Sequence, residues 1–301
     1  MSRYAVMDVG SNSLKLYVGR VVHGRVTDVD DRSTVNRLAE GLAASGELDE
    51  AAMDRTIDAI KELRDHALGL DAEKIVVVGT QALRQAENAR EFTTMVRNRC
   101  KLGVKVLPGE EEARLAYLAA ASSLDLGDGP VAVFDAGGAS TEVVVGEAGR
   151  VREAVSLPVG ARVLTDRHCA EDPVSDEAFA ALSADLAAIV ADAPPCRGGL
   201  VGIGSTAVSL ATVHHGVVDG DVDRVHGRSL SRDVVETAVT RLRGMTLNEK
   251  RRIPGLNPAR ADVMLAGAAI VAAIMARLSA DGMTVCARGL RHGVFQDRFV
   301  V

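Results

Sequence analysis

The sequence contains no tryptophan, and aromatic residues make up only 3% of its 301 positions. Proteins that bind single-stranded nucleic acid usually stack bases on aromatic side chains, so the scarcity of rings disfavours that class. The formal net charge of −6 also disfavours bulk binding of nucleic acid, which needs an excess of lysine and arginine. We therefore expect no nucleic-acid partner, although backbone N–H groups and a few arginines can still form a local anion site.

Cysteine is scarce as well, and the four cysteines are widely spaced without a Cys-x-x-Cys pair. This usage is typical of reduced thiols in a cytoplasmic protein. No signal peptide is expected, because the first residues lead directly into a short apolar strand. The longest apolar run, residues 263–276, has 14 residues and is too short to span a bilayer. The sequence thus predicts a soluble, cytoplasmic protein with no membrane partner.

Aliphatic residues are abundant by contrast, and hydrophobic residues make up 47% of the chain, enough for packed cores in two domains. Strand-like and helix-like patterns alternate, which predicts α/β layers with mixed sheets. The expected strands include residues 4–7, 21–29, 75–78 and 131–134, and the expected helices include residues 49–70, 110–124, 176–191 and 232–243. Further helices are expected at 258–280, with Asn257 and Pro258 at its start, and at 288–301.

Two segments share one design, in which a short apolar strand ends in aspartate and continues into a turn of small and hydroxyl residues. The first has Asp8, then Gly10, Ser11, Asn12 and Ser13; the second has Asp135, then Gly137, Gly138, Ala139 and Ser140. Such turns expose several backbone N–H groups that bind phosphate oxygens, and the carboxylate can hold hydrated Mg²⁺. One such turn could simply cap a hairpin, but two, one near the start of each predicted domain, favour a phosphate site. A third loop with Gly204 and Ser205 lies where a strand meets a helix N-terminus, which favours an anion.

Around these turns the sequence becomes specific to a family. The motifs that carry the resemblance are Asp8-Val9-Gly10-Ser11-Asn12-Ser13, Thr80-Gln81-Ala82-Leu83-Arg84, Gly109-Glu110-Glu111-Glu112-Ala113-Arg114, Asp135-Ala136-Gly137-Gly138-Ala139-Ser140-Thr141-Glu142, Ser156-Leu157-Pro158-Val159-Gly160, Arg260-Ala261-Asp262-Val263 and Arg288-Gly289-Leu290-Arg291-His292-Gly293. Their order resembles that of the exopolyphosphatase and guanosine pentaphosphate phosphohydrolase family, the Ppx/GppA phosphatases. The match runs from residue 4 to about residue 295 and looks like the short, two-domain form.

The resemblance implies a fold of the actin, Hsp70 and sugar-kinase superfamily, with two ribonuclease-H-like domains and a catalytic cleft between them. We expect residues 1–125 to form the first domain and 126–289 the second, with a linker at 125–130. The final helix, 290–301, is expected to return to the first domain. A homodimer is left open.

The resemblance also implies roles for individual residues. Glu112 matches the general base, and Arg84 matches an arginine that neutralises charge on the substrate. Asp135 and Glu142 match carboxylates that position water and Mg²⁺, with Asp8 as a third metal ligand and Mn²⁺ as the alternative ion. The expected phosphate cradle comprises Gly10, Ser11, Asn12, Ser13, Gly137, Gly138, Ala139, Ser140, Gly204 and Ser205.

Each of these roles has an ordinary alternative. Glu112 could be a solvated acid that offsets a helix dipole. Arg84 could pair with Glu87 or Glu91 on an exposed face, where an ion pair stabilises little. Glu142 could be a surface residue of a strand.

Three departures from the family pattern bear on the site. Ala139 has a Cβ where the family has glycine, which could crowd the phosphate or force a different φ. The loop at 202–206 is also altered. Arg162 comes one position earlier than the family arginine, and in extended chain such a shift reverses the side chain's face. Arg162 is therefore not carried over.

We expect a Mg²⁺-dependent exopolyphosphatase that releases orthophosphate from polyphosphate ends. Hydrolysis of guanosine pentaphosphate or of nucleoside di- and triphosphates in the same cleft is the second enzymatic hypothesis. A phosphate-ligand sensor with little turnover is the non-enzymatic one, motivated by Ala139 and the altered third loop. A sugar kinase is disfavoured because those kinases usually use an aspartate base.

Overall fold

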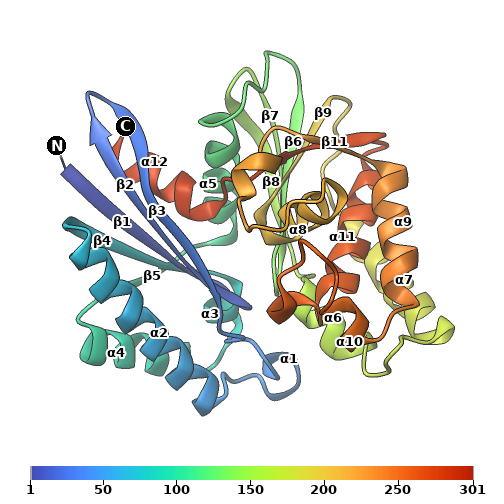
Figure 1. The fold of residues 1–301 in the computed structure, drawn as a ribbon, viewed down its shortest axis with the longest axis horizontal. Coiled ribbons are helices and arrows are strands. Elements are labelled where there is room, and N and C mark those ends of the chain that lie inside the picture. Colours follow the sequence, from blue (N-terminus) through green and yellow to red (C-terminus); the bar gives the residue numbers. More distant parts are fainter. Residues whose placement is uncertain (1, 301) are drawn as a thin grey trace. The chain divides into compact units, whose positions relative to one another are not determined.

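The computed structural model describes residues 2–300, and the chain divides into two compact units (Figure 1). Unit 1 comprises Met1–Ala119 with Leu290–Val301, and unit 2 comprises Ala120–Gly289. Each unit is built around a mixed sheet of its own, five-stranded in unit 1 and six-stranded in unit 2.

The sheet of unit 1 has helices on both faces. Its strands are β1 (Ser2–Val9), β2 (Ser13–Val22), β3 (Arg25–Val35), β4 (Ala72–Gly79) and β5 (Val104–Val106); its helices are α1 (Leu42–Ser45), α2 (Glu50–Gly69), α3 (Gln81–Gln85), α4 (Ala89–Cys100), α5 (Gly109–Ala121, which extends into unit 2) and α12 (Leu290–Phe299). Because successive strand residues face opposite sides, Met7 packs in the core that holds α2 and α4, whereas Val6 packs in the core that holds Leu115 of α5 and Phe295 of α12.

Unit 2 is organised around a helix that is apolar on nearly all sides. Its strands are β6 (Val131–Ala136), β7 (Thr141–Glu147), β8 (Arg150–Leu157), β9 (Gly199–Ile203), β10 (Ser229–Ser231) and β11 (Gly282–Cys286); its helices are α6 (Ala161–His168), α7 (Asp176–Val190), α8 (Gly204–His214), α9 (Arg232–Arg243), α10 (Leu247–Lys250) and α11 (Met264–Arg277), with 3-10 turns η1 (Val222–Val225) and η2 (Pro258–Arg260). Helix α11 contacts α6, α7, α8 and α9, which explains the long apolar run in the sequence.

The two sheets repeat one topology. The order is β3-β2-β1-β4-β5 in unit 1 and β8-β7-β6-β9-β11 in unit 2, where β10 adds an edge strand. In both, the first three strands are antiparallel neighbours and the remaining two pair in parallel. The predicted fold class, α/β with two ribonuclease-H-like domains, is confirmed.

Two expected elements are wrong in detail. The strand expected at 21–29 is a hairpin, because β2 ends at Val22 and β3 begins at Arg25, with Gly24 at φ 75° between them. The helix expected at 258–280 is interrupted: Asn257 and Pro258 start only η2, and α11 begins at Met264. The side chain of Asp262, in the interruption, accepts a hydrogen bond from the Val263 N–H and pairs with an arginine of α6.

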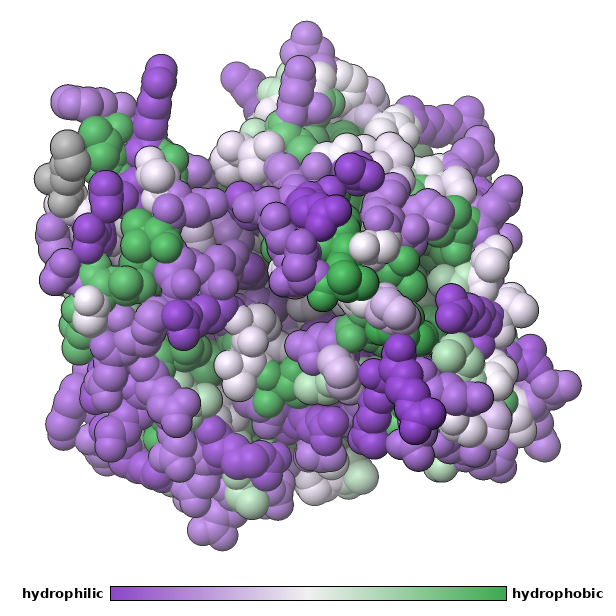
Figure 2. All heavy atoms as spheres, in the orientation of Figure 1, coloured by the Kyte–Doolittle hydropathy of each residue, from purple (hydrophilic) through white to green (hydrophobic). Residues whose placement is uncertain are grey.

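The surface drawn in Figure 2 is covered mainly by hydrophilic side chains, with hydrophobic ones in scattered patches. Among residues 2–300 the large hydrophobic side chains that are exposed are Leu68, Val151 and Val218. In the same range, every helix is too short or too polar to cross a bilayer.

Candidate functional site

Backbone hydrogen bonds hold the turn after β1, residues 10–13. The Gly10 N–H donates to the Ser13 carbonyl at 3.1 Å, and the Ala39 N–H donates to the Ser11 carbonyl at 2.9 Å. Ser11, Asn12 and Ser13 are all buried. These hydrogen bonds close the turn, and the strand β1 places Asp8 at its base.

Unsatisfied polar atoms gather at this turn. Asp8 and Asn12 are 4% and 6% exposed, and Asp8 Oδ1 and both amide atoms of Asn12 are buried without a hydrogen-bond partner. The other oxygen of Asp8 lies 3.7 Å from Lys15 Nζ. Because most buried polar groups in proteins are hydrogen-bonded, such a cluster is typical of a site that binds a polar ligand.

The turn after β6 has the same geometry. The Gly137 N–H donates to the Ser140 carbonyl at 3.0 Å, and a Cβ on Gly137 would lie 2.9 Å from that oxygen. A Cβ on Gly10 would lie at the same 2.9 Å from the Ser13 carbonyl oxygen. The structure thus shows one turn design in both units, as the sequence pattern indicated.

The first residues of helix α6 hold the second turn, residues 137–140 after β6, through backbone hydrogen bonds. The Arg162 N–H donates to the Gly138 carbonyl at 2.8 Å, and the Ala161 N–H donates to the Gly137 carbonyl at 2.9 Å. A Cβ on Gly160 would lie 2.3 Å from the Gly138 carbonyl carbon, so only glycine fits at the start of this helix. Gly160 lies in one of the motifs that carry the family resemblance, but the sequence gives no sign of this role.

Asp135 and Glu142 are direct cross-strand partners on β6 and β7. Residues paired in this way present their side chains on the same face, with Cβ atoms about 4.5–5.5 Å apart. Glu142 is 2% exposed, which excludes a surface role, and its Oε1 accepts a 2.7 Å hydrogen bond from Ser156 Oγ. Two carboxylates opposed in this way repel each other, and a divalent cation would offset the repulsion.

The third loop reaches the same carboxylates. Gly204, at φ 80°, begins α8 so close to Asp135 that a Cβ would lie 2.1 Å from Asp135 Oδ1. Thr206 Oγ1 donates to the Ala136 carbonyl at 3.1 Å. Ser205, in the first turn of α8, is partly exposed. The structure therefore places the predicted residues Gly204 and Ser205 beside the Asp135 turn.

Ala139 does not have the strained backbone that its Cβ could have forced. Six non-glycine residues among those described have positive φ, and Ala139 is not one of them. Its side chain is buried, 2% exposed. The Ala139 methyl therefore fits the turn without a left-handed backbone.

Arg84 and Glu112 meet in unit 1. Arg84 Nη1 donates to Glu112 Oε2 at 2.6 Å and to the Leu107 carbonyl at 2.7 Å. Their side chains are 18% and 10% exposed, so Glu112 is not a solvated first-turn acid and Arg84 is not part of an exposed pair with Glu87 or Glu91. The parallel pairing of β1 with β4 joins Val9 to Gly79, so α3, which carries Arg84, begins beside the end of the Asp8 strand.

Two arginines that sequence analysis did not include lie at the second turn. Arg162 is 4% exposed and pairs with Asp262 at 2.9 Å and Asp166 at 3.5 Å. Burial lowers the pKa of Arg260 to about 10, while the Asp262 and Asp135 carboxylates oppose that shift, so its guanidinium is charged at neutral pH. The only sequence signal was the Arg260-Ala261-Asp262 motif, quoted without a role.

Arg162 does not lie in extended chain, so the expected reversal of its side chain's face is wrong. Residues 161–168 form a helix, in which a one-residue shift turns a side chain by about a quarter of a turn rather than to the opposite face. That rotation takes Arg162 into the buried pair with Asp262, and Arg162 Nε is buried there without a hydrogen-bond partner.

The carboxylates fit a magnesium ion bound in the usual way. Among residues 2–300 no three His, Cys, Asp or Glu side chains are grouped as a metal cage. Mg²⁺ is commonly held by one or two carboxylates together with substrate phosphates and water. The opposed pair of Asp135 and Glu142 matches that arrangement.

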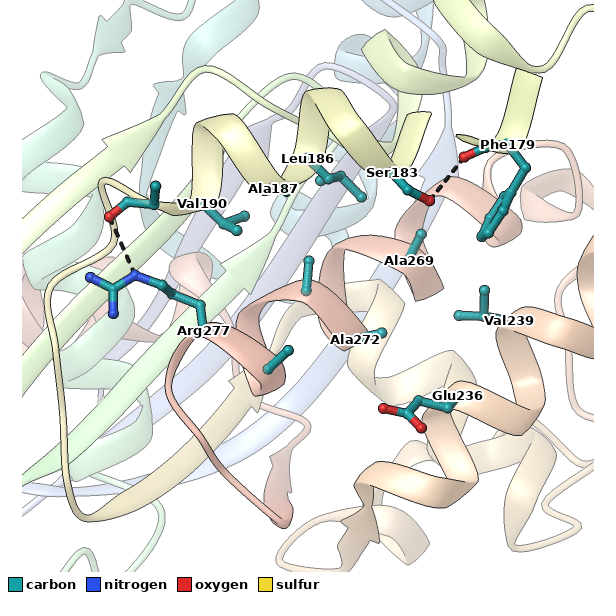
Figure 3. A pocket seen from close by; sticks show the side chains of 13 residues that line it. Phe179, Ser183, Leu186, Ala187, Val190, Glu236, Val239, Ala269, Ala272 and Arg277 are labelled. Carbon is teal, nitrogen blue, oxygen red and sulfur yellow. Dashed lines mark hydrogen bonds between the residues drawn. The ribbon is translucent and has the colours of Figure 1, made fainter. Parts of the chain in front are cut away.

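A separate groove of about 590 Å³ lies in unit 2 between α7, α9 and α11. Figure 3 shows Ala269 and Ala272 of α11 between Leu186 of α7 and Val239 of α9. The groove is lined mainly by apolar side chains and contains none of the predicted site residues. Its chemistry does not suit a highly charged phosphate.

The profile described as the Ppx/GppA phosphatase family matches residues 17–299. The chain is 30% identical over 300 residues to a guanosine-5'-triphosphate,3'-diphosphate pyrophosphatase of Photobacterium profundum, covering 98% of this chain and 59% of that protein. It is 29% identical to exopolyphosphatase 1 of Mycobacterium tuberculosis, covering 97% of this chain and 87% of that protein.

A solved structure is similar over its whole length. The Aquifex aeolicus member of the Ppx/GppA family superimposes with a TM-score of 0.83 at 32% identity, covering 98% of this chain and 97% of that one. The chain thus spans a little under three fifths of the Photobacterium relative but nearly all of the Aquifex one.

Proposed function

Because the chain belongs to the Ppx/GppA phosphatase family, we propose that it is a phosphoanhydride hydrolase, specifically an exopolyphosphatase that releases terminal orthophosphate. The observation that supports this most directly is the repeated turn. Asp8 with Gly10 and Asp135 with Gly137 end a strand in the same way and close on a serine carbonyl at the same distance. Two such turns offer backbone N–H groups to phosphate oxygens.

In this proposal Glu112 is the general base that takes a proton from the attacking water. A positioned base contributes about 10²–10⁴-fold to the rate. The partly buried Arg260 supplies positive charge beside the second turn, whereas the charge of the buried Arg162 is offset by Asp262 and Asp166. Phosphoryl transfer depends mainly on such positioning and charge neutralisation.

Asp135 and Glu142 would hold Mg²⁺, or Mn²⁺ as the alternative, with Asp8 as a further candidate. The bound ion would neutralise charge on phosphate oxygens. The four cysteines are free thiols, and the cytoplasmic location stays a prediction.

The test is Glu112→Gln, with Glu110→Gln as the matched control because Glu110 is exposed in the same helical turn. We expect phosphate release from polyphosphate with Mg²⁺ to fall by about 10²–10⁴-fold in Glu112→Gln and to stay unchanged in Glu110→Gln. A single cooperative thermal transition above the assay temperature would show intact folding in both variants. Full activity of folded Glu112→Gln would refute the base assignment.

A second candidate is hydrolysis of guanosine pentaphosphate, favoured by the name of the Photobacterium relative. Hydrolysis of nucleoside di- and triphosphates would use the same residues. Rates on polyphosphate, guanosine pentaphosphate and ATP, measured side by side, separate these substrates. Tight phosphate-ligand binding without phosphate release would instead favour the sensor, although the unstrained Ala139 removes part of its motivation.

A further inference from the structure

The guanidinium of Arg84 is held on three sides inside unit 1. Gln81 Oε1 accepts from Arg84 Nε at 2.9 Å and from Nη2 at 2.6 Å. Nη1 donates to the Leu107 carbonyl at 2.7 Å and to Glu112 Oε2 at 2.6 Å. Gln81 and Arg84 are three residues apart on α3 and therefore lie on the same face of that helix.

These contacts use most of the donors of Arg84. A guanidinium has five N–H groups in a rigid planar fork. The four bonds to Gln81, Leu107 and Glu112 leave one N–H, on Nη2. A bidentate grip on a phosphate needs two adjacent N–H groups, so Arg84 held in this way is suited to orient Glu112 rather than to clamp a phosphate.

We propose that Gln81 is a positioning residue for hydrolysis, acting through Arg84 on the Glu112 carboxylate. This inference rests on the proposed function, in which Glu112 is the base. Gln81 occupies the Nε and Nη2 edge of the guanidinium, and because the group is planar this fixes the direction of Nη1 toward Glu112. Arg84 then orients the Glu112 carboxylate. This role replaces the one expected from sequence, in which Arg84 neutralises charge on the substrate.

We expect loss of the Gln81 acceptor to lower kcat rather than to weaken substrate binding. A base that is displaced by about 1 Å can lose about 10²-fold in rate. Removing the Gln81 acceptor frees the guanidinium to rotate and releases the carboxylate that it holds. Substrate contacts made elsewhere stay in place, so KM should change little.

The experiment uses the full chain with polyphosphate and Mg²⁺. Gln81→Met keeps the length of the side chain and removes its acceptor, and Gln85→Met is the control because Gln85 is exposed on the same helix. We expect Gln81→Met to lower kcat about 10²-fold with KM within about threefold, and Gln85→Met to change neither. Gln81→Glu, whose carboxylate accepts the same two bonds, should restore most of kcat.

Two results would overturn the inference. One is unchanged kcat in Gln81→Met. The other is a rise in KM that is larger in Gln81→Glu than in Gln81→Met, which would mean that residue 81 contacts the anionic substrate itself. In the Glu112→Gln background, Gln81→Met should lower the residual activity no further, because both changes act on one base.

If the wild type releases phosphate from no substrate, the proposed function fails, and the melting temperatures of Gln81→Met, Glu112→Gln and the double variant still test the coupling. A shift of the double variant that is smaller than the sum of the two single-variant shifts supports coupling among Gln81, Arg84 and Glu112. Strictly additive shifts overturn it.

Discussion

Gly204 and Asp135 are in such close contact that a Cβ on residue 204 would lie 2.1 Å from Asp135 Oδ1. Gly204→Ala should therefore displace this carboxylate, and the left-handed φ of 80° adds about 1–2 kcal/mol of strain. Gly216→Ala is the control, because Gly216 also has a left-handed φ but nothing within 4 Å of a Cβ. We expect both variants to melt earlier in a thermal scan, and only Gly204→Ala to need more Mg²⁺ for half-maximal activity.

Because the opposed carboxylates Asp135 and Glu142 repel each other, we expect the thermal stability of the fold to depend on Mg²⁺. Without divalent ions, Glu142→Gln should melt at or above the wild-type temperature, because it removes the repulsion and its amide oxygen can still accept from Ser156. Added Mg²⁺ should raise the melting temperature of the wild type but not that of the variant. The exposed Glu153 provides the control variant Glu153→Gln, which should respond to Mg²⁺ like the wild type.

We expect Arg260 to stabilise the anionic phosphate substrate through its positive charge. Its pKa of about 10 keeps it charged at pH 7, and the charge is lost only as the pH rises through that value. Arg260→Met should lower activity by about 10²–10³-fold, the effect of losing one well-placed charge or donor on a phosphoryl oxygen. Arg252→Met, at an exposed position, should keep wild-type rates in the same phosphate-release assay. Wild-type rates in Arg260→Met would exclude a role at the site.

Asp31 fastens α12 to β3 through a bidentate pair, in which Arg291 Nε and Nη2 each lie 2.7 Å from a carboxylate oxygen. Burial alone would raise the pKa of Asp31, but the Arg291 and His292 side chains outweigh it and hold the pKa well below its usual range. The pair therefore stabilises the fold fully above the unfolded pKa of about 3.9, and the stabilisation is lost as the pH falls below that value. Asp31→Asn should cost about 1–3 kcal/mol at pH 7.

The measurement for Asp31 is urea unfolding of the full chain between pH 7 and pH 3. The difference between wild type and Asp31→Asn should shrink as the pH is lowered, whereas Glu73→Gln, at an exposed position of the same unit, should show almost no difference at any pH. A difference that grows on acidification would contradict the assigned pairing.

Much of the fold and both turns could be predicted because their signals are local. A strand that ends in aspartate, followed by glycine and serine, defines the Asp8 and Asp135 turns within a few residues. The strand order was not visible in the same way, since it depends on pairing between β1 and β4 across more than 60 residues. The resemblance to a family supplied that part.

The contacts within the site were harder to predict than its residues. Arg84 and Glu112 are 28 positions apart, and only the fold shows that Leu107 and Gln81 join them in one network. Helix α6 was missed because Gly160 precedes it without a side-chain cap, so the usual start signal is absent. The buried pairs of Arg162 followed from that helix.

The return of α12 to unit 1 has a consequence for truncated chains. Phe295 and Val294 complete a core with Val6 and Tyr17, residues that precede them in the sequence by 277 to 289 positions. Unit 2 is continuous in sequence and takes no segment from elsewhere in the chain, whereas the core of unit 1 is incomplete without the segment Leu290–Val301. A chain truncated after Gly289 should therefore contain a protease-resistant unit 2 and an N-terminal segment that is still open to cleavage.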